Sequence, residues 1–172
     1  MRAPHPASLL LGAAAAVLAR GLLRRALLAR FRRDLGALND GDYGPLLSAY
    51  ADDAVLYFND GPHRWAGEHR GRVAIERFLR EFTNAGLRGE LLGVWIAGSP
   101  WALTMVARFD DRAAAPDGSG LLYENRVVIV TRTRWGKIVE QHDFYEDTSR
   151  ILALEQALRE RGVRPAGLRP AS

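Results

Sequence analysis

The stretch EQHDFYED at residues 140–147 carries the side chains best suited to acid–base chemistry. It holds four carboxylates, one histidine and two aromatic residues, and it alternates as a strand does. Because every second residue of a strand shares a face, Asp143 should lie beside Val139, Gln141 and Tyr145, opposite Glu140. The opposite face should also hold Ile138, His142 and Phe144. If Asp143 points into a pocket with no cation nearby, burial raises its pKa and suits it to proton transfer; otherwise it is a surface acid.

A second pair of charged residues lies on an earlier strand, in ARFDD at 107–111. Arg108 and Asp110 are two residues apart and therefore share a strand face. The alternate face of the same strand is more apolar, with Trp101, Leu103, Met105, Ala107 and Phe109. Two arrangements stay open. Either the apolar face packs on the core and leaves Arg108 and Asp110 in water, or a second copy of the chain covers it and the charged pair faces a pocket.

Charge is distributed unevenly along the chain. Residues 1–33 hold seven arginines and no acid, whereas the remainder holds 17 basic and 20 acidic residues. The net charge of +4 thus reflects one arm, and the body gives no reason to expect a nucleic-acid partner. Without cysteine, disulfides and thiolate metal sites are excluded. No other residues complete a metal set, so we expect neither a metal nor a cofactor.

The arginine-rich arm contains an apolar run at residues 7–19, followed by Arg20. A signal peptide, a peripheral cationic helix and a solvated helical extension all fit this pattern. A membrane span needs about 20 apolar residues, more than this run supplies. We expect an extension over residues 1–24 of a cytoplasmic protein, and membrane contact through residues 7–31 stays open.

The remaining chain shows helices first and strands later. Leucine and phenylalanine spacing predicts a helix from about residue 22 to Gly41, and Pro45 begins a short second helix. A strand at 54–60 and a turn at 67–71 precede a helix over 72–85. The second half is predicted to hold strands at 88–97, 101–111, 121–134 and 137–146, a helix at 149–161 and a flexible tail at 162–172. Helices gathered on one face of an antiparallel sheet give an α+β domain.

This order resembles the SnoaL-like branch of the nuclear-transport-factor-2 (NTF2) superfamily. Four stretches carry the resemblance: 37–58, 65–79, GSPW at 98–101, and 123–148. The resemblance implies an NTF2-like, cystatin-like cone over residues 25–161, in which a bent antiparallel sheet wraps about three helices and leaves a deep pocket. The superfamily includes isomerases, polyketide cyclases, dehydratases, epoxide hydrolases and non-enzymes, so the site must be matched residue by residue.

Two enzyme patterns of the superfamily give different matches. The ketosteroid-isomerase pattern does not match, because Phe58 stands where that family has its general base. The limonene-epoxide-hydrolase pattern matches better: its Arg-x-Asp and its last-strand Asp correspond to Arg108, Asp110 and Asp143. The resemblance implies that the arginine holds two carboxyls, one ionised and one protonated, which open an epoxide with water.

Pocket residues follow from the same resemblance. The epoxide hydrolases carry a Tyr-x-Asn that positions water, and Tyr57-Phe58-Asn59 has those residues one position late, which requires a bulge. We expect these three residues, with Trp101 and Tyr145, to line the pocket.

The sequence therefore predicts a small-molecule pocket protein with an apolar or polycyclic ligand and a homodimer formed through the outer sheet face. Two classes of function stay open: a cofactor-free epoxide hydrolase, cyclase or isomerase, and a non-catalytic binding or dimerisation module. They differ in whether Asp110 and Asp143 meet Arg108 inside a cavity.

Overall fold

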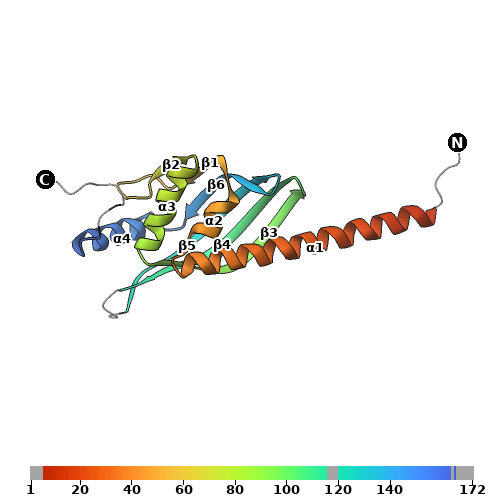
Figure 1. Cartoon of the computed structure of the whole chain (residues 1–172). Coiled ribbons are helices and arrows are strands. Elements are labelled where there is room, and N and C mark those ends of the chain that lie inside the picture. Colours follow the sequence, from red (N-terminus) through yellow and green to blue (C-terminus); the bar gives the residue numbers. More distant parts are fainter. Residues whose placement is uncertain (1–5, 116–119, 164, 166–172) are drawn as a thin grey trace.

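A computed structural model describes residues 6–115, 120–163 and 165 of the chain, without the side chains of 6–17, 19 and 20. In chain order its elements are α1 (Pro6–Asn39), α2 (Gly44–Ala49), β1 (Tyr50–Phe58), β2 (Gly67–Arg70), α3 (Arg72–Asn84), β3 (Leu87–Ser99), β4 (Ala102–Ala114), β5 (Leu121–Arg134), β6 (Lys137–Tyr145) and α4 (Thr148–Glu160). Helices α1, α2 and α3 lie together on one face of a single curved sheet (Figure 1). The predicted α+β cone is thereby confirmed.

The sheet has the strand order β2-β1-β6-β5-β4-β3. The meander β3–β6 is antiparallel, as predicted, but β1 runs parallel to β6, so the sheet is mixed. The stretch predicted as a turn at 67–71 is instead mostly the edge strand β2, in which Gly67 pairs with Phe58. This pairing supplies backbone partners to the edge of β1 that β6 leaves free.

The turn between β5 and β6 fixes which side chains face the helices. Trp135 and Gly136 both have positive φ, 51° and 77°, as a two-residue type I′ hairpin requires. A bulge follows, because Arg132 pairs with Glu140 while Thr133 pairs with Ile138. The alternation predicted for residues 140–145 holds, but Ile138 lies on the helix side with Gln141 rather than opposite it.

Helix α3 packs on the sheet through the residues that its spacing predicts. Ile75, Phe78, Leu79 and Phe82 are buried in the main core cluster. Gly71 before the helix and Gly86 after it have φ of 79° and 69°, backbone angles that residues with a Cβ rarely adopt. The helix therefore begins and ends where glycine allows the chain to turn.

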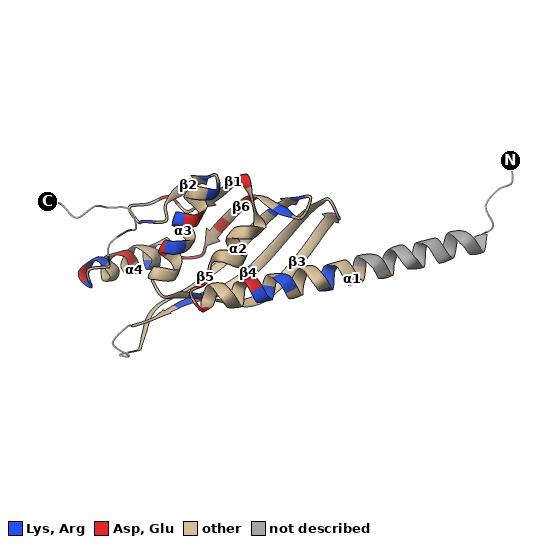
Figure 2. Ribbon diagram, viewed as in Figure 1, with Lys and Arg blue, Asp and Glu red and all other residues tan. Residues whose placement is uncertain are grey.

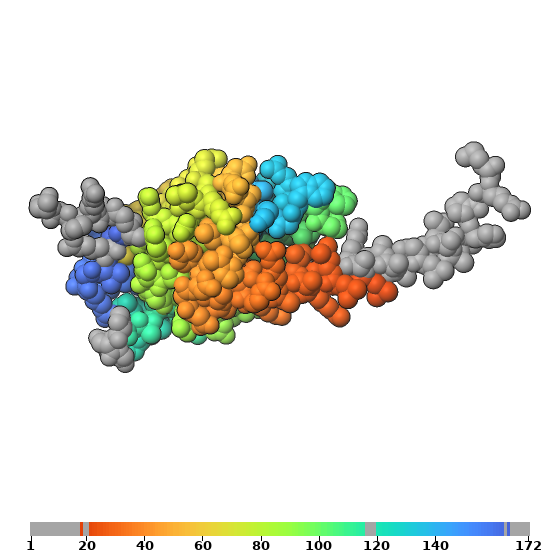
Figure 3. Space-filling model, viewed as in Figure 1, coloured from red at the N-terminus to blue at the C-terminus, as the bar shows by residue number. Residues whose placement is uncertain are grey.

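Helix α1 is continuous from Pro6 to Asn39, and only its C-terminal half lies on the body (Figures 1 and 3). The Asn39 side chain fastens that half to β3, because it donates to the carbonyl of Gly89 and accepts from its N–H, both at 2.9 Å. Farther out, Leu18 and Leu22 are exposed. Figure 2 shows arginines along α1 and mixed charges on the body.

Two predictions concern the N-terminal arm and the C-terminal tail of the chain. Within the described parts of the chain, no helix is long and apolar enough to cross a membrane. Most of the tail predicted at 162–172 lies outside the described residues.

Candidate functional site

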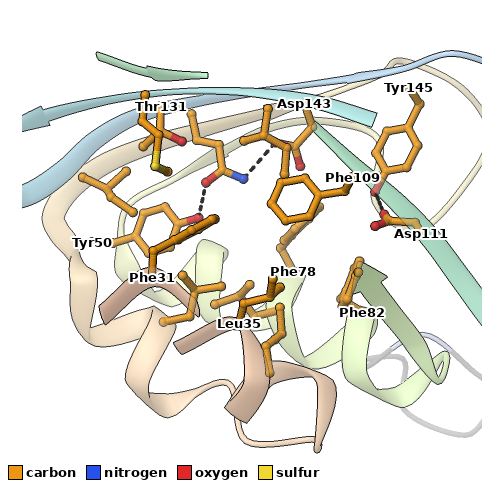
Figure 4. A pocket seen from close by; sticks show the side chains of 18 residues that line it. Phe31, Leu35, Tyr50, Phe78, Phe82, Phe109, Asp111, Thr131, Asp143 and Tyr145 are labelled. Atoms are coloured by element: carbon orange, nitrogen blue, oxygen red, sulfur yellow. Dashed lines mark hydrogen bonds between the residues drawn. The ribbon is translucent and has the colours of Figure 1, made fainter. Parts of the chain in front are cut away.

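A cavity of about 80 Å³ lies between the helices and the inner face of the sheet (Figure 4). Its lining is mainly apolar: Phe31, Leu35 and Leu38 from α1, Phe78, Leu79 and Phe82 from α3, and Met105, Phe109 and Ile129 from the strands. Six polar side chains on the sheet side interrupt this lining, namely Tyr50, Asp111, Thr131, Gln141, Asp143 and Tyr145. The cavity thus has a mainly apolar lining that includes two carboxyl groups.

Strand alternation explains how these polar groups reach the cavity. On β4, Met105 and Phe109 face the helices, and Asp111 is the next residue on the same face. On β6, Gln141, Asp143 and Tyr145 share the inner face. Strand alternation therefore places each carboxyl on the face that packs against the helices.

Asp143 is held by a chain of hydrogen bonds within the protein. Gln141 Nε2 donates to Asp143 Oδ1 at 2.8 Å, and the Tyr50 hydroxyl donates to Gln141 Oε1 at 2.6 Å. Because Tyr50 occupies the amide oxygen, the amide group must present its NH₂ to the carboxyl. Gln141 is thus a positioning residue for Asp143.

Asp111 has its own donor at the other end of the cavity. The Tyr145 hydroxyl donates to Asp111 Oδ2 at 2.5 Å (Figure 4). Gly89 pairs with Asp111 across the strands, and a Cβ on it would stand 3.1 Å from Asp111 Oδ1. Glycine therefore keeps space open beside this carboxyl.

Burial raises the pKa of both carboxyls to about 7. The hydrogen bond from Tyr145 opposes the rise at Asp111, and that from Gln141 opposes it at Asp143. The charge of Asp110 adds to the rise at Asp111, and the charge of Asp111 adds to the rise at Asp143. Among the described side chains, no cation forms an ion pair with either group. Near neutral pH, one carboxyl can hold a proton while the other has lost it.

The sequence profile of the SnoaL-like domain matches residues 29–141, more than half of the chain. This chain belongs to the SnoaL-like family. No curated protein matches its sequence.

Solved structures share the fold of this SnoaL-like protein at low identity. An NTF2-like protein of unknown function from Burkholderia pseudomallei is 23% identical with a TM-score of 0.62, over 74% of this chain and 95% of that one. A candidate isomerase from Rhodopseudomonas palustris is 19% identical, with a TM-score of 0.56 and coverage of 77% and 96%. A candidate polyketide cyclase from Sinorhizobium meliloti is 20% identical, with a TM-score of 0.51 and coverage of 67% and 94%.

The structure does not bring the predicted trio of this SnoaL-like protein together. Asp143 lines the cavity, but Arg108 is exposed on the outer face of β4. Asp110 also lies on that face, 3.6 Å from Arg112 and 3.8 Å from Arg126. The predicted geometry, with Asp110 and Asp143 flanking Arg108, is corrected: the apolar face of β4 packs on the core, and this turns Arg108 and Asp110 outward.

The predicted pocket residues divide in the same way. Tyr145 lines the cavity, and Phe58 packs behind it with ring centroids 4.8 Å apart. The Asn59 side chain accepts from the Tyr145 backbone N–H at 3.2 Å. Tyr57 and Trp101 lie away from the cavity, which is a correction. The register of β1 against β6 shifts between Tyr50 and Val55, but Tyr57 stacks on His142, which lies on the strand face opposite Asp143. Trp101 is 56% exposed in the β3–β4 turn.

Asp111, Gln141 and Tyr50 were not among the site residues predicted from the sequence. A signal for the first was present, since Asp111 follows Phe109 by two residues on the face already recognised as apolar. Gln141 shares a face with Asp143 by the same rule. Nothing in the local pattern marks Tyr50, because its role depends on the pairing of β1 with β6. In the described residues, no group of three or more metal-ligating side chains occurs.

Proposed function

We propose that this protein binds a small, mainly apolar carbonyl compound and catalyses proton transfer at the carbon next to the carbonyl, as cofactor-free isomerases and cyclases do. The observation that carries the proposal is the pair of buried carboxyls, Asp111 and Asp143, in a mainly apolar cavity. With a pKa of about 7, each group can give or take a proton near neutral pH.

The reaction requires one carboxyl in each state. The ionised carboxyl takes a proton from the carbon beside the carbonyl, and the C–H electron pair becomes the C=C bond of an enol. The protonated carboxyl gives its proton to the carbonyl oxygen, which receives the C=O π pair. In a substrate with a C=C bond next to that carbon, such as 4-penten-2-one, the enol is a conjugated dienol. The first carboxyl returns its proton to the far carbon of the dienol, and the hydroxyl proton goes back to the second carboxyl as the C=O bond re-forms. Both carboxyls are then restored, so no further reactant is needed. Such acid–base assistance contributes typically 10²–10⁴-fold.

Two features support this class of reaction over epoxide opening. The names of two structures with this fold, a candidate isomerase and a candidate polyketide cyclase, fit enol chemistry. The arginine that an epoxide-hydrolase cluster uses has no counterpart in the described cavity lining, because Arg108 is on the outer face.

A non-catalytic binding protein is the second candidate. The observation that favours it is that Gln141 and Tyr145 already donate hydrogen bonds to the carboxyls. Buried polar groups need such partners even in a protein that only binds its ligand. The two candidates differ in whether bound ketone exchanges its protons.

The deciding experiment is hydrogen–deuterium exchange of 2-butanone and 4-penten-2-one in D₂O, followed by NMR from pH 5 to pH 9. We expect wild-type protein to accelerate exchange, and we expect Asp111→Asn and Asp143→Asn each to lose about 100-fold or more. Glu140→Gln, which changes an acid that pairs with Arg132 on the outer face of β6, should keep wild-type rates. If both ketones bind but exchange no faster than in buffer, the protein is the non-catalytic module.

A further inference from the structure

A second apolar hollow of about 90 Å³ adjoins the cavity on the side of α1. Its lining includes Leu27 and Phe31 of α1, Ile96 of β3 and Leu103 of β4, all of them half-buried. We call it the outer hollow, and we call the cavity that holds the carboxyls the inner cavity. The charged residues that line the outer hollow are Arg30 and Asp34, and they pair with each other at 3.4 Å.

The two spaces share one wall. Five residues line both of them: Phe31, Leu46, Met105, Thr131 and Ile138. In Figure 4, Phe31 and Thr131 lie at one end of the inner cavity, and Asp111 with Tyr145 lies at the opposite end. Asp111 is therefore at the end away from the outer hollow, Asp143 lies between the two ends, and the shared wall is at the end that meets the outer hollow.

We propose that both spaces together hold one unbranched apolar chain, with its carbonyl group beside the carboxyls, its tail in the outer hollow, and Phe31 as the residue that sets the accepted chain length. This inference rests on the proposed function, which it deepens by naming a substrate class.

The sizes of the spaces favour a chain over a polycyclic ligand. Pockets for drug-sized ligands usually measure about 300–1,000 Å³, whereas the two spaces measure about 80 and 90 Å³. A rigid ring system would have to displace the whole shared wall. A chain one methylene wide needs only the Phe31 ring and the flexible Met105 side chain to move aside, and methionine adapts readily to such changes.

The polarity along the path agrees with this orientation. Between the carboxyls and the charged pair Arg30–Asp34, the residues that line both spaces are apolar except Thr131. An apolar tail there loses contact with water, while its carbonyl reaches the only described carboxyls of the inner cavity.

The test is the binding of straight-chain 2-alkanones, from 2-butanone to 2-undecanone, to full-length protein by isothermal titration calorimetry. For wild-type protein we expect the dissociation constant to fall about fourfold per added methylene until the outer hollow is filled. This length series depends on no variant. A dissociation constant that does not change with chain length would overturn the inference.

Variants of the shared wall identify the residue that sets the length. Phe31→Trp should abolish the gain in affinity from longer chains, and Met105→Trp serves if the first variant does not fold. Ala29→Trp, at an exposed position of α1 that lines neither space, should behave as wild type. Retention of the full length dependence in both wall variants contradicts the assigned role.

The outcome separates this inference from the proposed function. If 2-butanone exchanges its protons but longer ketones bind no better, only the two-space inference fails. If the length series is obeyed and no ketone exchanges, the acid–base proposal fails and the chain-binding site stands.

Discussion

Asp143 is buried, and among the described side chains no cation pairs with it, so this carboxyl costs stability when it is ionised. Its pKa is about 7 in the folded protein, against about 3.9 in an unfolded chain. Between these values the folded state binds the extra proton, so the free energy of unfolding should rise as pH falls from about 7 to about 4. The full difference of about three pKa units corresponds to roughly 4 kcal/mol.

We therefore expect Asp143→Asn to be more stable than wild type at pH 8 and to gain less stability between pH 8 and pH 5. Urea denaturation at the two pH values measures this. Glu140→Gln, on the outer face of β6, is the control and should leave the pH dependence of wild type in place. A wild-type protein whose stability rises with pH over this range, with Asp143→Asn unchanged from it, would show that Asp143 is not buried as described.

Tyr145 acts on the other carboxyl, and its removal should move the pH profile in a defined direction. The hydroxyl donates to Asp111 and thereby lowers a pKa that burial raises. Tyr145→Phe should raise the pKa of Asp111 above 7 and shift the pH–rate profile of ketone exchange to higher pH. Tyr57→Phe, on the outer face, is the matched control. A shift to lower pH, or an equal shift in both variants, would contradict this role for Tyr145.

At the scale of elements, α3 carries much of the wall that separates the cavity from solvent. Phe78 is 5% exposed, belongs to the main core cluster and lines the cavity. Replacing it with alanine should cost about 3–5 kcal/mol in unfolding free energy, measured by urea denaturation. Val73→Ala is the control, because this side chain of α3 is 76% exposed and its loss should cost far less. Equal stability of Phe78→Ala and wild type would refute the packing of α3.

Elements with a strong local pattern were predictable, and those fixed by pairing were not. The spacing of Ile75, Phe78 and Phe82 marks α3 by itself, because one apolar face at helical period is enough to define a surface helix. Strand β2 has no such pattern: Gly67 to Arg70 become a strand only because β1 offers them a free edge. The bulge near Ile138 likewise exists only in the register of β5 with β6.

The same distinction explains the site. Asp143 could be placed on the inner face from alternation and the family resemblance, and the structure puts it there. Its partner was misassigned by one residue, since the Arg-x-Asp spacing pointed to Asp110 whereas the apolar face of β4 carries Asp111. The donor Tyr50 belongs to β1, which pairs with β6, and Tyr50 is 91 residues before Gln141 in the sequence. No local pattern reveals such a contact.

At the scale of the whole molecule, the outer sheet face is the first surface to consider. Trp95, Val128 and Phe144 are exposed on it, and Val128 pairs directly with Phe144. Apolar groups gathered on one face mark contact surfaces, and we propose that a second copy of this chain covers them. Sedimentation should show a dimer that Phe144→Glu converts to monomer, while Val73→Glu, at an exposed position on α3, should stay dimeric. A monomeric wild type at high concentration would contradict the dimer.

The N-terminal half of α1, which projects from the body, is a second candidate contact surface. The described side chains from Gly21 to Ala26 are exposed, and contact with the body begins at Leu27, where the lining of the outer hollow also begins. A protein that lacks residues 1–22 should therefore fold, keep its thermal unfolding midpoint within a few degrees, and still bind 2-alkanones. The deleted stretch contains the apolar run 7–19, and arginines continue beyond it.

Such a run beside cationic side chains is suited to the surface of an anionic membrane, where apolar residues enter the headgroup boundary and each basic residue adds about 1 kcal/mol. We propose that full-length protein binds vesicles of mixed phosphatidylcholine and phosphatidylserine, more weakly at high salt, and that the truncated protein binds them far less. Cosedimentation of both proteins with the same vesicles measures this, with pure phosphatidylcholine vesicles as the control. Equal binding by the two proteins would place any membrane contact outside residues 1–22. Failure of the truncated protein to fold would make the arm part of the core, and the role of a separate membrane-binding segment would be lost.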